Sequence, residues 1–247
     1  MRYFIELAYH GKHYNGWQIQ KTGVSVEEVL EKKLSLLLRR PINIVGAGRT
    51  DSRVHAKQMF AHFDFDKEIE IDFVRRLNTF LPRSIKVFNI HRVKNEAHAR
   101  FDALSRTYKY LLSSGKNPFY EDLSWTWLNG PLCMEKMNEA ADVLMHYYDF
   151  SSFCKTGGQN KTSICKIYQA HWKYREDLLC FTIEANRFLR NMVRAIVGTL
   201  VDVGRGKIDT EDFIKIIQAK DRKRAGSSAP EAGLFLTEIR YPEEIFL

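Results

Sequence analysis

The sequence predicts an α+β fold made of two pseudo-symmetric, ferredoxin-like halves, each an antiparallel sheet flanked by helices. The elements expected over residues 1–104 follow the order β-α-β-β-α-β, and a similar split β-α-β order returns over residues 105–247. The composition is globular, with 45% apolar residues and only 14 Gly and 6 Pro among 247 residues. Collagen-like and broadly disordered classes are therefore excluded.

The first half opens on residues 2–9, whose aromatic and aliphatic side chains are typical of a strand. Ser25 and Glu28 then form a capping box, and apolar residues follow at helical spacing as far as Leu38. The remaining elements expected in this half are strands at 42–45, 58–65 and 85–93, with a helix at 73–80.

The second half opens on a strand at 107–113, and a helix is expected at 134–148. Residues 179–185 alternate between apolar and polar, which predicts the second arm of a hairpin whose first arm is 164–174. A long helix from Arg187 to about Val203, a short helix near 211–218 and a strand at 236–241 complete the chain. The two halves show no visible sequence alignment, so their pseudo-symmetry rests on element order.

The charge of the chain predicts an anionic partner, because 38 Lys and Arg face 30 Asp and Glu, a formal net charge of +8. The excess is uneven. Residues 1–104 carry 18 basic and 12 acidic side chains, and residues 105–247 carry 20 and 18. We therefore expect the partner to contact the first half more heavily.

The compartment signals predict a cytosolic protein without membrane segments. The N-terminus has no signal-peptide pattern, and no apolar run approaches the roughly 18 residues that span a bilayer. Four cysteines occur without a Cys-x-x-Cys pair, so we expect reduced thiols and no metal site.

The first candidate site is the stretch from Gly46 to Ala56, where glycines allow the backbone to approach a ligand closely. It contains Asp51, with Arg49 and Arg53 each two residues away. Flanking guanidinium groups favour the ionised carboxylate, which suits a nucleophile or an electrostatic stabiliser. The alternative is that Asp51 caps a turn or makes a surface ion pair.

The second candidate is a basic stripe on the long helix, where Arg187, Arg190 and Arg194 fall at i, i+3 and i+7. No acidic residue occurs between Arg187 and Val201, so the stripe has no partners one turn away. We expect contact with phosphate or with a distant carboxylate. A solvated charged face is the alternative.

Arginines also alternate with aromatic residues in two segments, around Arg100-Phe101 and over residues 106–110, as in proteins that recognise single-stranded RNA. Tyr108 and Tyr110 point the same way on a strand, although a tyrosine stripe is more often core. By contrast, five acidic residues alternate with apolar ones over residues 64–72. We interpret that segment as a solvent-facing edge that RNA avoids.

Six motifs, in order along nearly the whole chain, resemble the tRNA pseudouridine synthase A (TruA-type) family. They are Tyr9-His10-Gly11 with Tyr14-Asn15-Gly16-Trp17-Gln18, Gly48-Arg49-Thr50-Asp51 with Val54-His55-Ala56, His98-Ala99-Arg100-Phe101, Arg106-Thr107-Tyr108-Lys109-Tyr110, Asn191-Met192-Val193-Arg194 with Val197-Gly198-Thr199-Leu200, and Arg224-Ala225-Gly226 with Ala229-Pro230 and Gly233-Leu234-Phe235-Leu236.

The resemblance implies isomerisation of uridine to pseudouridine at positions 38, 39 and 40 of the tRNA anticodon stem-loop, without a cofactor. It implies that Asp51 is the catalytic aspartate, that Arg194 pairs with it and that Tyr108 stacks on the target base. Arg49 and Arg100 would help to extrude the nucleotide, and Arg49, Arg53 and Arg100 would lie in or near the Asp51 loop. The family is also implied to act as a homodimer, with tRNA crossing a basic cleft between the two halves.

The chain departs from the family directly after Asp51, where Ser52-Arg53 stands in place of the usual Ala-Gly. Such a change alters the loop if the glycine needs a positive φ, or adds a phosphate contact. Two rival functions remain open. One is an inert RNA-binding protein, and the other is a metal-dependent nuclease that uses Asp51 with Asp64 or Asp66.

Overall fold

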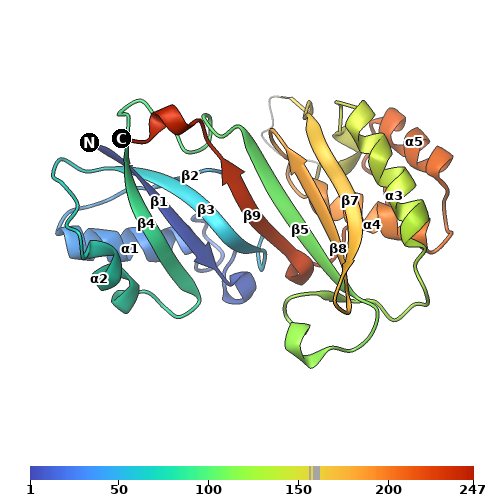
Figure 1. Ribbon diagram of the computed structural model, residues 1–247, viewed down its shortest axis with the longest axis horizontal. Helices are drawn as coiled ribbons and strands as arrows, with labels where there is room; N and C mark the ends of the chain where they lie inside the picture. Colours follow the sequence, from blue (N-terminus) through green and yellow to red (C-terminus); the bar gives the residue numbers. More distant parts are fainter. Residues whose placement is uncertain (156, 158–161) are drawn as a thin grey trace. The chain divides into compact units, whose positions relative to one another are not determined.

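The computed structural model describes every residue except 156 and 158–161, and the chain divides into two compact units (Figure 1). Unit 1 is Met1–Ser105 with Phe235–Leu247, and unit 2 is Arg106–Leu234. The division after residue 105 lies one residue from the boundary expected from the sequence. The difference is the C-terminal segment, which the sequence placed in the second half.

Unit 1 has the ferredoxin-like order expected of the first half. Its elements are β1 (Arg2–Tyr9), α1 (Val26–Leu38), β2 (Val45–Gly46), β3 (His55–Asp64), α2 (Phe73–Phe80), β4 (Ile85–Val93) and β9 (Leu234–Arg240). The first four strands pair antiparallel in the order β4-β1-β3-β2, and α1 and α2 lie on one face of this sheet (Figure 1). β9 adds a short parallel pairing to β3, with Phe235 opposite His55.

The helices of unit 1 begin where their sequence signals place them. The Ser25 hydroxyl accepts the Glu28 backbone N–H at 3.1 Å, and α1 then buries Val26, Leu30 and Leu34. This contact satisfies one of the backbone donors that every helix start leaves open. The predicted strand at 42–45 shortens to two residues, because the N–H groups of Ile42 and Ile44 bond to side chains of α1 instead of a strand.

Aromatic packing explains why the C-terminal segment belongs to unit 1. The Tyr241 ring contacts Phe4 and Phe60, each at a centroid distance of 5.2 Å, and Phe246 meets Phe4 at 6.1 Å. Edge-to-face pairs of this kind add to the free energy gained by burial. The first half alone lacks these two rings, and the chain returns at its end to supply them.

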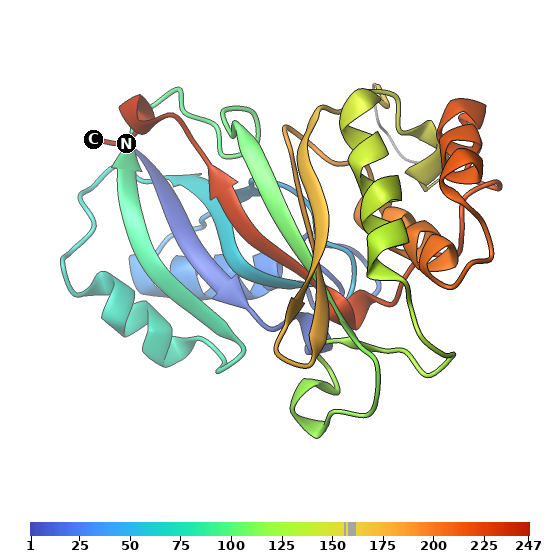
Figure 2. The same cartoon turned by 45° about the vertical axis from the view of Figure 1, so that its right-hand side comes forward.

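Unit 2 is built on a smaller, mostly antiparallel sheet. Its elements are β5 (Ser105–Ser113), β6 (Trp125–Thr126), α3 (Met134–Val143), β7 (Ile167–Arg175), β8 (Leu178–Ala185), α4 (Met192–Gly204) and α5 (Thr210–Ala219). β5, β8 and β7 pair antiparallel in that order, and β6 runs parallel to β5. The three helices gather on one side of this sheet (Figure 2).

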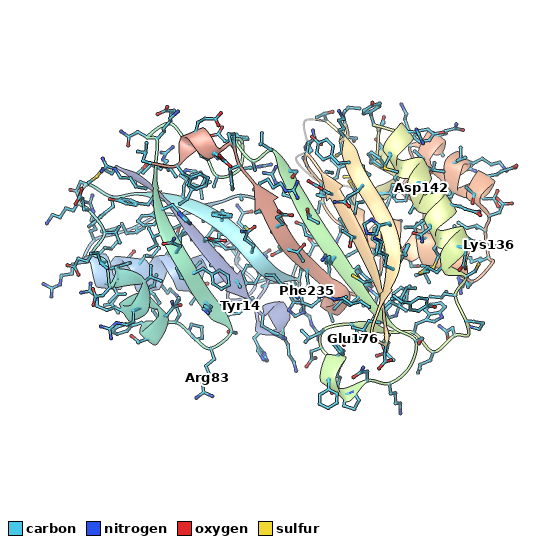
Figure 3. All side chains as sticks on the ribbon, viewed as in Figure 1. Tyr14, Arg83, Lys136, Asp142, Glu176 and Phe235 are labelled. Atoms are coloured by element: carbon cyan, nitrogen blue, oxygen red, sulfur yellow. The ribbon has the colours of Figure 1, made fainter. Side chains whose placement is uncertain are left out.

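Turns set several element ends that the sequence placed differently. The β7–β8 hairpin turns at Glu176, which has a φ of 54° and lies at the tip of the two strands (Figure 3). The predicted helix at 134–148 ends at Val143 and passes into a single 3-10 turn. None of the helices in the described part of the chain combines the length and the hydrophobicity of a membrane-spanning segment.

Candidate active site

Asp51 begins a tight turn in unit 1. The Val54 N–H donates to the Asp51 carbonyl at 3.2 Å, which closes a four-residue turn over residues 51–54. Arg53, the third residue of this turn, has a φ of 64°. A positive φ at that position is what a type II turn requires, and glycine or asparagine usually supplies it. The turn therefore holds Arg53 in a conformation that costs a side-chain-bearing residue about 1–2 kcal/mol.

Residues 9–17 hold this turn from outside. The Tyr9 hydroxyl and the Thr50 hydroxyl lie 2.8 Å apart, and the Trp17 N–H donates to the Thr50 carbonyl at 3.3 Å. The Arg53 N–H donates to the carbonyl of Tyr14 at 3.1 Å (Tyr14 is labelled in Figure 3). The backbone on both sides of Asp51 is thus fixed by a segment about forty residues earlier in the chain.

Two glycines make this close approach possible. Gly16 has a φ of 79°, and a Cβ there would collide with the Thr50 carbonyl oxygen. A Cβ on Gly11 would collide with the Val54 carbonyl oxygen, and the Gly11 N–H donates to Nδ1 of the buried His55 at 3.0 Å. The part that these two glycines play in supporting the Asp51 turn was not predicted from the sequence. Their signal was the glycine in each half of the motif over residues 9–18.

The arginines beside Asp51 are exposed. Arg49 and Arg53 both point to solvent from the loop, in keeping with the expected basic surround. The pKa of Glu27 on α1 is affected by the charge of Arg49. Burial raises the pKa of Glu27, whereas the Ile19 N–H, which donates to its carboxylate at 2.9 Å, and the nearby charge of Arg49 act in the opposite direction.

Arg100 does not lie in the Asp51 loop, contrary to the expectation from the sequence. Its segment is anchored where β1 starts and β3 ends, because Arg2 donates to the Ala97 carbonyl at 3.0 Å and the Ala99 N–H to Nδ1 of His62 at 3.2 Å. His62 is seven residues along β3 from His55, a distance of about 23 Å at 3.3 Å per residue. The Arg100 guanidinium instead lies over the Phe101 ring, 5.7 Å from its centroid.

Tyr108 lies half-buried on β5 in unit 2, and its ring meets Phe188 edge-on at a centroid distance of 5.1 Å. Tyr110, two residues further on the same face, is fully buried, and its hydroxyl donates to the Pro230 carbonyl at 2.9 Å. Burial raises the pKa of Tyr110 well above its usual range. Of the two tyrosines, only Tyr108 has ring surface left for a ligand.

Arg194 is held close to Tyr110 by the segment at 229–231. Its Nε donates to the Ala229 carbonyl at 2.7 Å, and its Nη2 lies 2.7 Å from the Glu231 carboxylate. The Arg194 side chain is only 13% exposed. Unit 2 therefore brings Tyr110 and Arg194 together at residues 229–231, and Tyr108 lies two residues from Tyr110 on the same face of β5.

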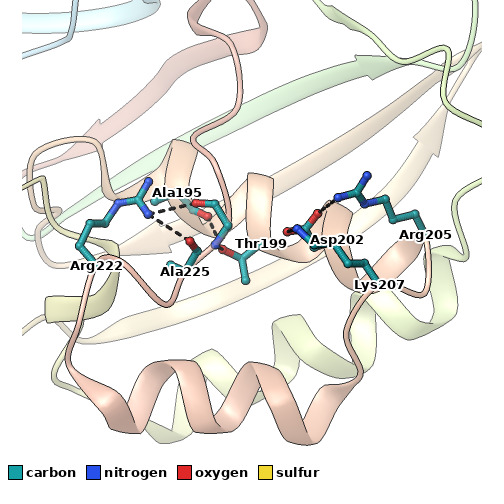
Figure 4. Close-up of polar contacts among 8 residues, drawn as sticks. Ala195, Thr199, Asp202, Arg205, Lys207, Arg222 and Ala225 are labelled. Carbon is teal, nitrogen blue, oxygen red and sulfur yellow. Dashed lines mark hydrogen bonds and ion pairs between the residues drawn. The ribbon is translucent and has the colours of Figure 1, made fainter.

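That segment rests directly on α4. A Cβ on Gly198 would collide with the Ser227 carbonyl oxygen, so only glycine lets the two backbones touch. The Gly226 N–H donates to the Thr199 hydroxyl at 3.0 Å, and this hydroxyl donates to the Ala195 carbonyl at 2.8 Å. Figure 4 shows this contact beside the Asp202 carboxylate, which pairs with Arg205 at 2.6 Å and with Lys207 at 3.2 Å.

The predicted basic stripe on the long helix is wrong, because α4 begins at Met192 and only Arg194 lies on it. Asn191 precedes the helix with a φ of 64°, a left-handed conformation that breaks helical geometry before residue 192. The Arg187 guanidinium donates to the carbonyls of Thr162 and Ile164, at 3.0 and 3.2 Å. Arg190 is exposed in the connection before α4.

Comparison with known proteins gives these two sites a family. A family model described as tRNA pseudouridine synthase matches residues 143–242. A tRNA pseudouridine synthase A from Bacteroides fragilis is 52% identical, covering 99% of this chain and 98% of the relative. Those from Parabacteroides distasonis and Porphyromonas gingivalis are 51% and 47% identical, covering 99% and 100% of this chain and 98% and 99% of theirs. The chain belongs to the tRNA pseudouridine synthase A family.

Four of the motifs that resemble tRNA pseudouridine synthase A form two pairs, and the two members of each pair pack against each other. Residues 9–18 hold the Asp51 turn in unit 1, and residues 224–230 rest on the first turns of α4 in unit 2. The departure after Asp51 also has a physical consequence. The family's usual glycine stands where the backbone has a positive φ, and here Arg53 adopts that conformation with its side chain exposed.

The acidic segment at 64–72 differs from the expected strand edge, because β3 ends at Asp64. Each of its five carboxylates pairs with an arginine. The pairs are Asp64 with Arg2 at 2.8 Å, Asp66 with Arg40 at 2.6 Å, Glu68 with Arg92 at 3.7 Å, Glu70 with Arg76 at 2.8 Å and Asp72 with Arg75 at 3.4 Å. The segment is exposed, as expected, but its charge is largely neutralised.

These pairs also argue against the nuclease hypothesis. Asp64 and Asp66 are engaged by arginines, and Asp64 lies nine residues along β3 from His55, about 30 Å from the start of the strand that follows Asp51. Within the described parts of the chain, no group of three His, Cys, Asp or Glu side chains is placed to hold a metal ion.

Proposed function

We propose that this protein isomerises uridine to pseudouridine at positions 38, 39 and 40 of the tRNA anticodon stem-loop, with Asp51 as the catalytic carboxylate. The observation that carries the proposal is the Asp51 turn, which residues 9–17 fix on both sides. Relatives that match over nearly their whole length bear the name tRNA pseudouridine synthase A, which supports tRNA as the substrate.

The reaction rearranges one nucleotide without gain or loss of atoms. The bond between N1 of uracil and C1′ of ribose breaks, a bond between C5 and C1′ forms, and the hydrogen on C5 is replaced by one on N1. No electrons enter or leave, so the chemistry needs no redox cofactor. The Asp51 side chain supplies the nucleophile, directed at the uracil ring or at C1′.

The other residues prepare the nucleotide. A uridine within a stem has to leave the stack, at a cost of a few kcal/mol, and stacking on an aromatic ring offsets this cost. Tyr108 supplies that ring, and Arg194 is the basic residue of the site. Arg49 and Arg53, beside Asp51, hold the extruded nucleotide, whereas Arg100 contacts a more distant part of the RNA. Arg187 and Arg190 are further RNA contacts.

Asp51→Asn tests the proposal, with Asp66→Asn as a matched control on the same unit. We expect Asp51→Asn to abolish pseudouridine at positions 38–40 of unmodified tRNA, mapped by carbodiimide chemistry, while tRNA binding largely persists. Asp66→Asn retains activity. If the wild-type protein binds tRNA but forms no pseudouridine, the chain is an inert RNA-binding protein instead.

Two further properties stay predictions from the sequence and the family resemblance. One is action in the cytosol, and the other is assembly as a homodimer. Sedimentation equilibrium at micromolar concentration tests the second, and a mass near 28.9 kDa, that of one chain, would contradict it.

A further inference from the structure

Unit 2 contains a pocket of about 300 Å³ at the start of α4, and its lining includes Arg194, the basic residue of the proposed site. It is lined by Lys155, Asn191, Arg194, Arg222, Ser228 and Glu231. Three of these side chains are cationic and one is anionic. The single carboxylate, Glu231, already pairs with Arg194 at 2.7 Å, so the lining offers no further carboxylate to Lys155 and Arg222.

Arg222 is held in a fixed orientation by the backbone that it faces. Its Nη1 donates to the Gly226 carbonyl at 3.0 Å and more weakly to the Ala225 carbonyl at 3.4 Å, and its Nη2 donates to the Ser228 hydroxyl at 2.9 Å (Figure 4 shows Arg222 and Ala225). These contacts use three of the five N–H donors of a guanidinium group. The remaining two stay available on a side chain that needs little further ordering.

The Ser228 hydroxyl is left with its hydrogen as a hydrogen-bond donor, because its oxygen already accepts two hydrogen bonds. Its oxygen accepts hydrogen bonds from Arg222 Nη2, at 2.9 Å, and from Asn191 Nδ2, at 2.6 Å. A hydroxyl oxygen has two lone pairs and one hydrogen, so both acceptor positions are filled and the hydrogen points to a third partner. The Asn191 amide, used in this way, does not cap α4, whose N-terminal end adds a partial positive charge.

We propose that this pocket binds a phosphodiester group of the tRNA. The inference rests on the proposed function for its substrate, and adds a contact that orients the RNA on unit 2. A hydroxyl donor, a pre-oriented guanidinium and an ammonium converge on a pocket large enough for a phosphate group. An anion with several acceptor oxygens matches these donors, and Arg222 can offer two N–H groups to one phosphate.

Lys155→Gln is the first test, because Lys155 is exposed and its loss removes one charge from the pocket. The matched control is Lys223→Gln, an exposed lysine next to Arg222 that does not line the pocket. We expect Lys155→Gln to weaken tRNA binding at low salt and to reduce the salt dependence of the affinity by about one phosphate contact. The ratio of wild-type to Lys155→Gln affinity for tRNA should then fall about three- to four-fold between 50 and 200 mM salt.

A set of anticodon stem-loops, each with one methylphosphonate linkage in place of a phosphate, identifies which phosphate binds in the pocket. At the phosphate that occupies the pocket, the neutral linkage and Lys155→Gln weaken binding by no more together than either does alone. Arg222→Gln is the second variant, and circular dichroism first establishes that it folds. If all linkages give additive losses with both variants, or if Lys155→Gln behaves as Lys223→Gln does, the proposal is wrong.

A third arm separates RNA from a free anion. Inorganic phosphate is titrated against the wild-type protein and Lys155→Gln by thermal shift. Binding of inorganic phosphate together with unchanged tRNA affinity in Lys155→Gln overturns the RNA assignment. Because all three arms measure binding, they are independent of pseudouridine formation, whose absence in the wild-type protein would count against the proposed function alone.

Discussion

The acidic segment at 64–72 in unit 1 and the pocket at the start of α4 in unit 2 differ in their balance of carboxylates and cations. In the acidic segment, five carboxylates face five arginines, and the pairs lie at the exposed surface. In the pocket, three cations share one carboxylate. An anionic ligand is attracted where cations outnumber carboxylates, and this favours the second region as the proposed RNA contact although fewer charges gather there.

This difference revises what the net charge predicted. The first 104 residues hold 18 of the basic side chains, and their excess of six suggested that the RNA leans on that half. Five of those basic side chains are paired within or beside the acidic segment. The second half, nearly neutral by count, places Lys155 and Arg222 in one pocket whose described lining holds Glu231 as its one carboxylate.

Gly198→Ala is expected to have the largest effect, because it removes the support of the pocket. A Cβ there collides with the Ser227 carbonyl, so the segment at 222–231 has to move away from α4. Overpacking of this kind costs about 1–3 kcal/mol of unfolding free energy, measured by urea titration. The displaced Ser228 and Arg222 should also weaken tRNA binding.

The control for Gly198→Ala is Gly115→Ala. Nothing lies within 4 Å of a Cβ built on Gly115, so its unfolding free energy should change by less than about 0.5 kcal/mol. Equal stability of the two variants would mean that the segment at 222–231 is not held against α4.

Glu231→Gln should give an intermediate effect and change the pocket in the opposite sense. Arg194 loses a partner at 2.7 Å while its side chain is only 13% exposed, which should cost about 1–2 kcal/mol of stability. Removal of the one carboxylate should nevertheless tighten tRNA binding at low salt. Glu238→Gln, which breaks an exposed pair with Arg240, is the control, and it should alter neither measurement appreciably.

Asp64→Asn should have the smallest effect on stability, and the size of this effect should depend on pH. The hydrogen bonds from Arg2 hold the pKa of Asp64 below its usual value. The pair therefore stabilises the fold above the unfolded pKa near 4, and this contribution is lost as pH falls through the lower folded value. Since the Asp64 side chain is 64% exposed, the cost at pH 7 should be under about 1 kcal/mol.

Urea titrations between pH 7 and pH 2.5 check this. The wild-type protein should lose more stability on acidification than Asp64→Asn, with little difference in tRNA affinity at pH 7. A gain in tRNA affinity as large as that of Glu231→Gln would show that the acidic segment also faces RNA, and the contrast between the two regions would disappear.

Local patterns predicted most of the fold. The helix at 73–80 and the strands at 2–9 and 85–93 have the bounds expected from the sequence. Their apolar spacing and end signals lie within the element itself. The order of elements also predicted the ferredoxin-like arrangement of unit 1. Where a boundary depended on a distant partner, as for the strand at 42–45, prediction failed, because α1 takes its backbone donors.

The candidate site was predictable in its residue types and less so in its arrangement. Asp51 with two neighbouring arginines is visible in the sequence, and Tyr108 and Arg194 followed from the family resemblance. The left-handed Asn191 was not visible, so the arginines before it were wrongly placed on one helix. Nor could the acidic alternation reveal that each carboxylate finds an arginine, since those partners come from β1, β4, α2 and the end of α1.

The left-handed backbone at Arg53 restricts what mutation can place beside Asp51. Glycine and asparagine tolerate this conformation, whereas the β-branched residues Val, Ile and Thr are the most strongly disfavoured there. Few other residues therefore fit position 53 without strain. Arg53 occupies this conformation at a backbone cost of about 1–2 kcal/mol. In a library randomised at position 53, survivors selected for folding alone and survivors selected for activity on tRNA should consequently differ in composition.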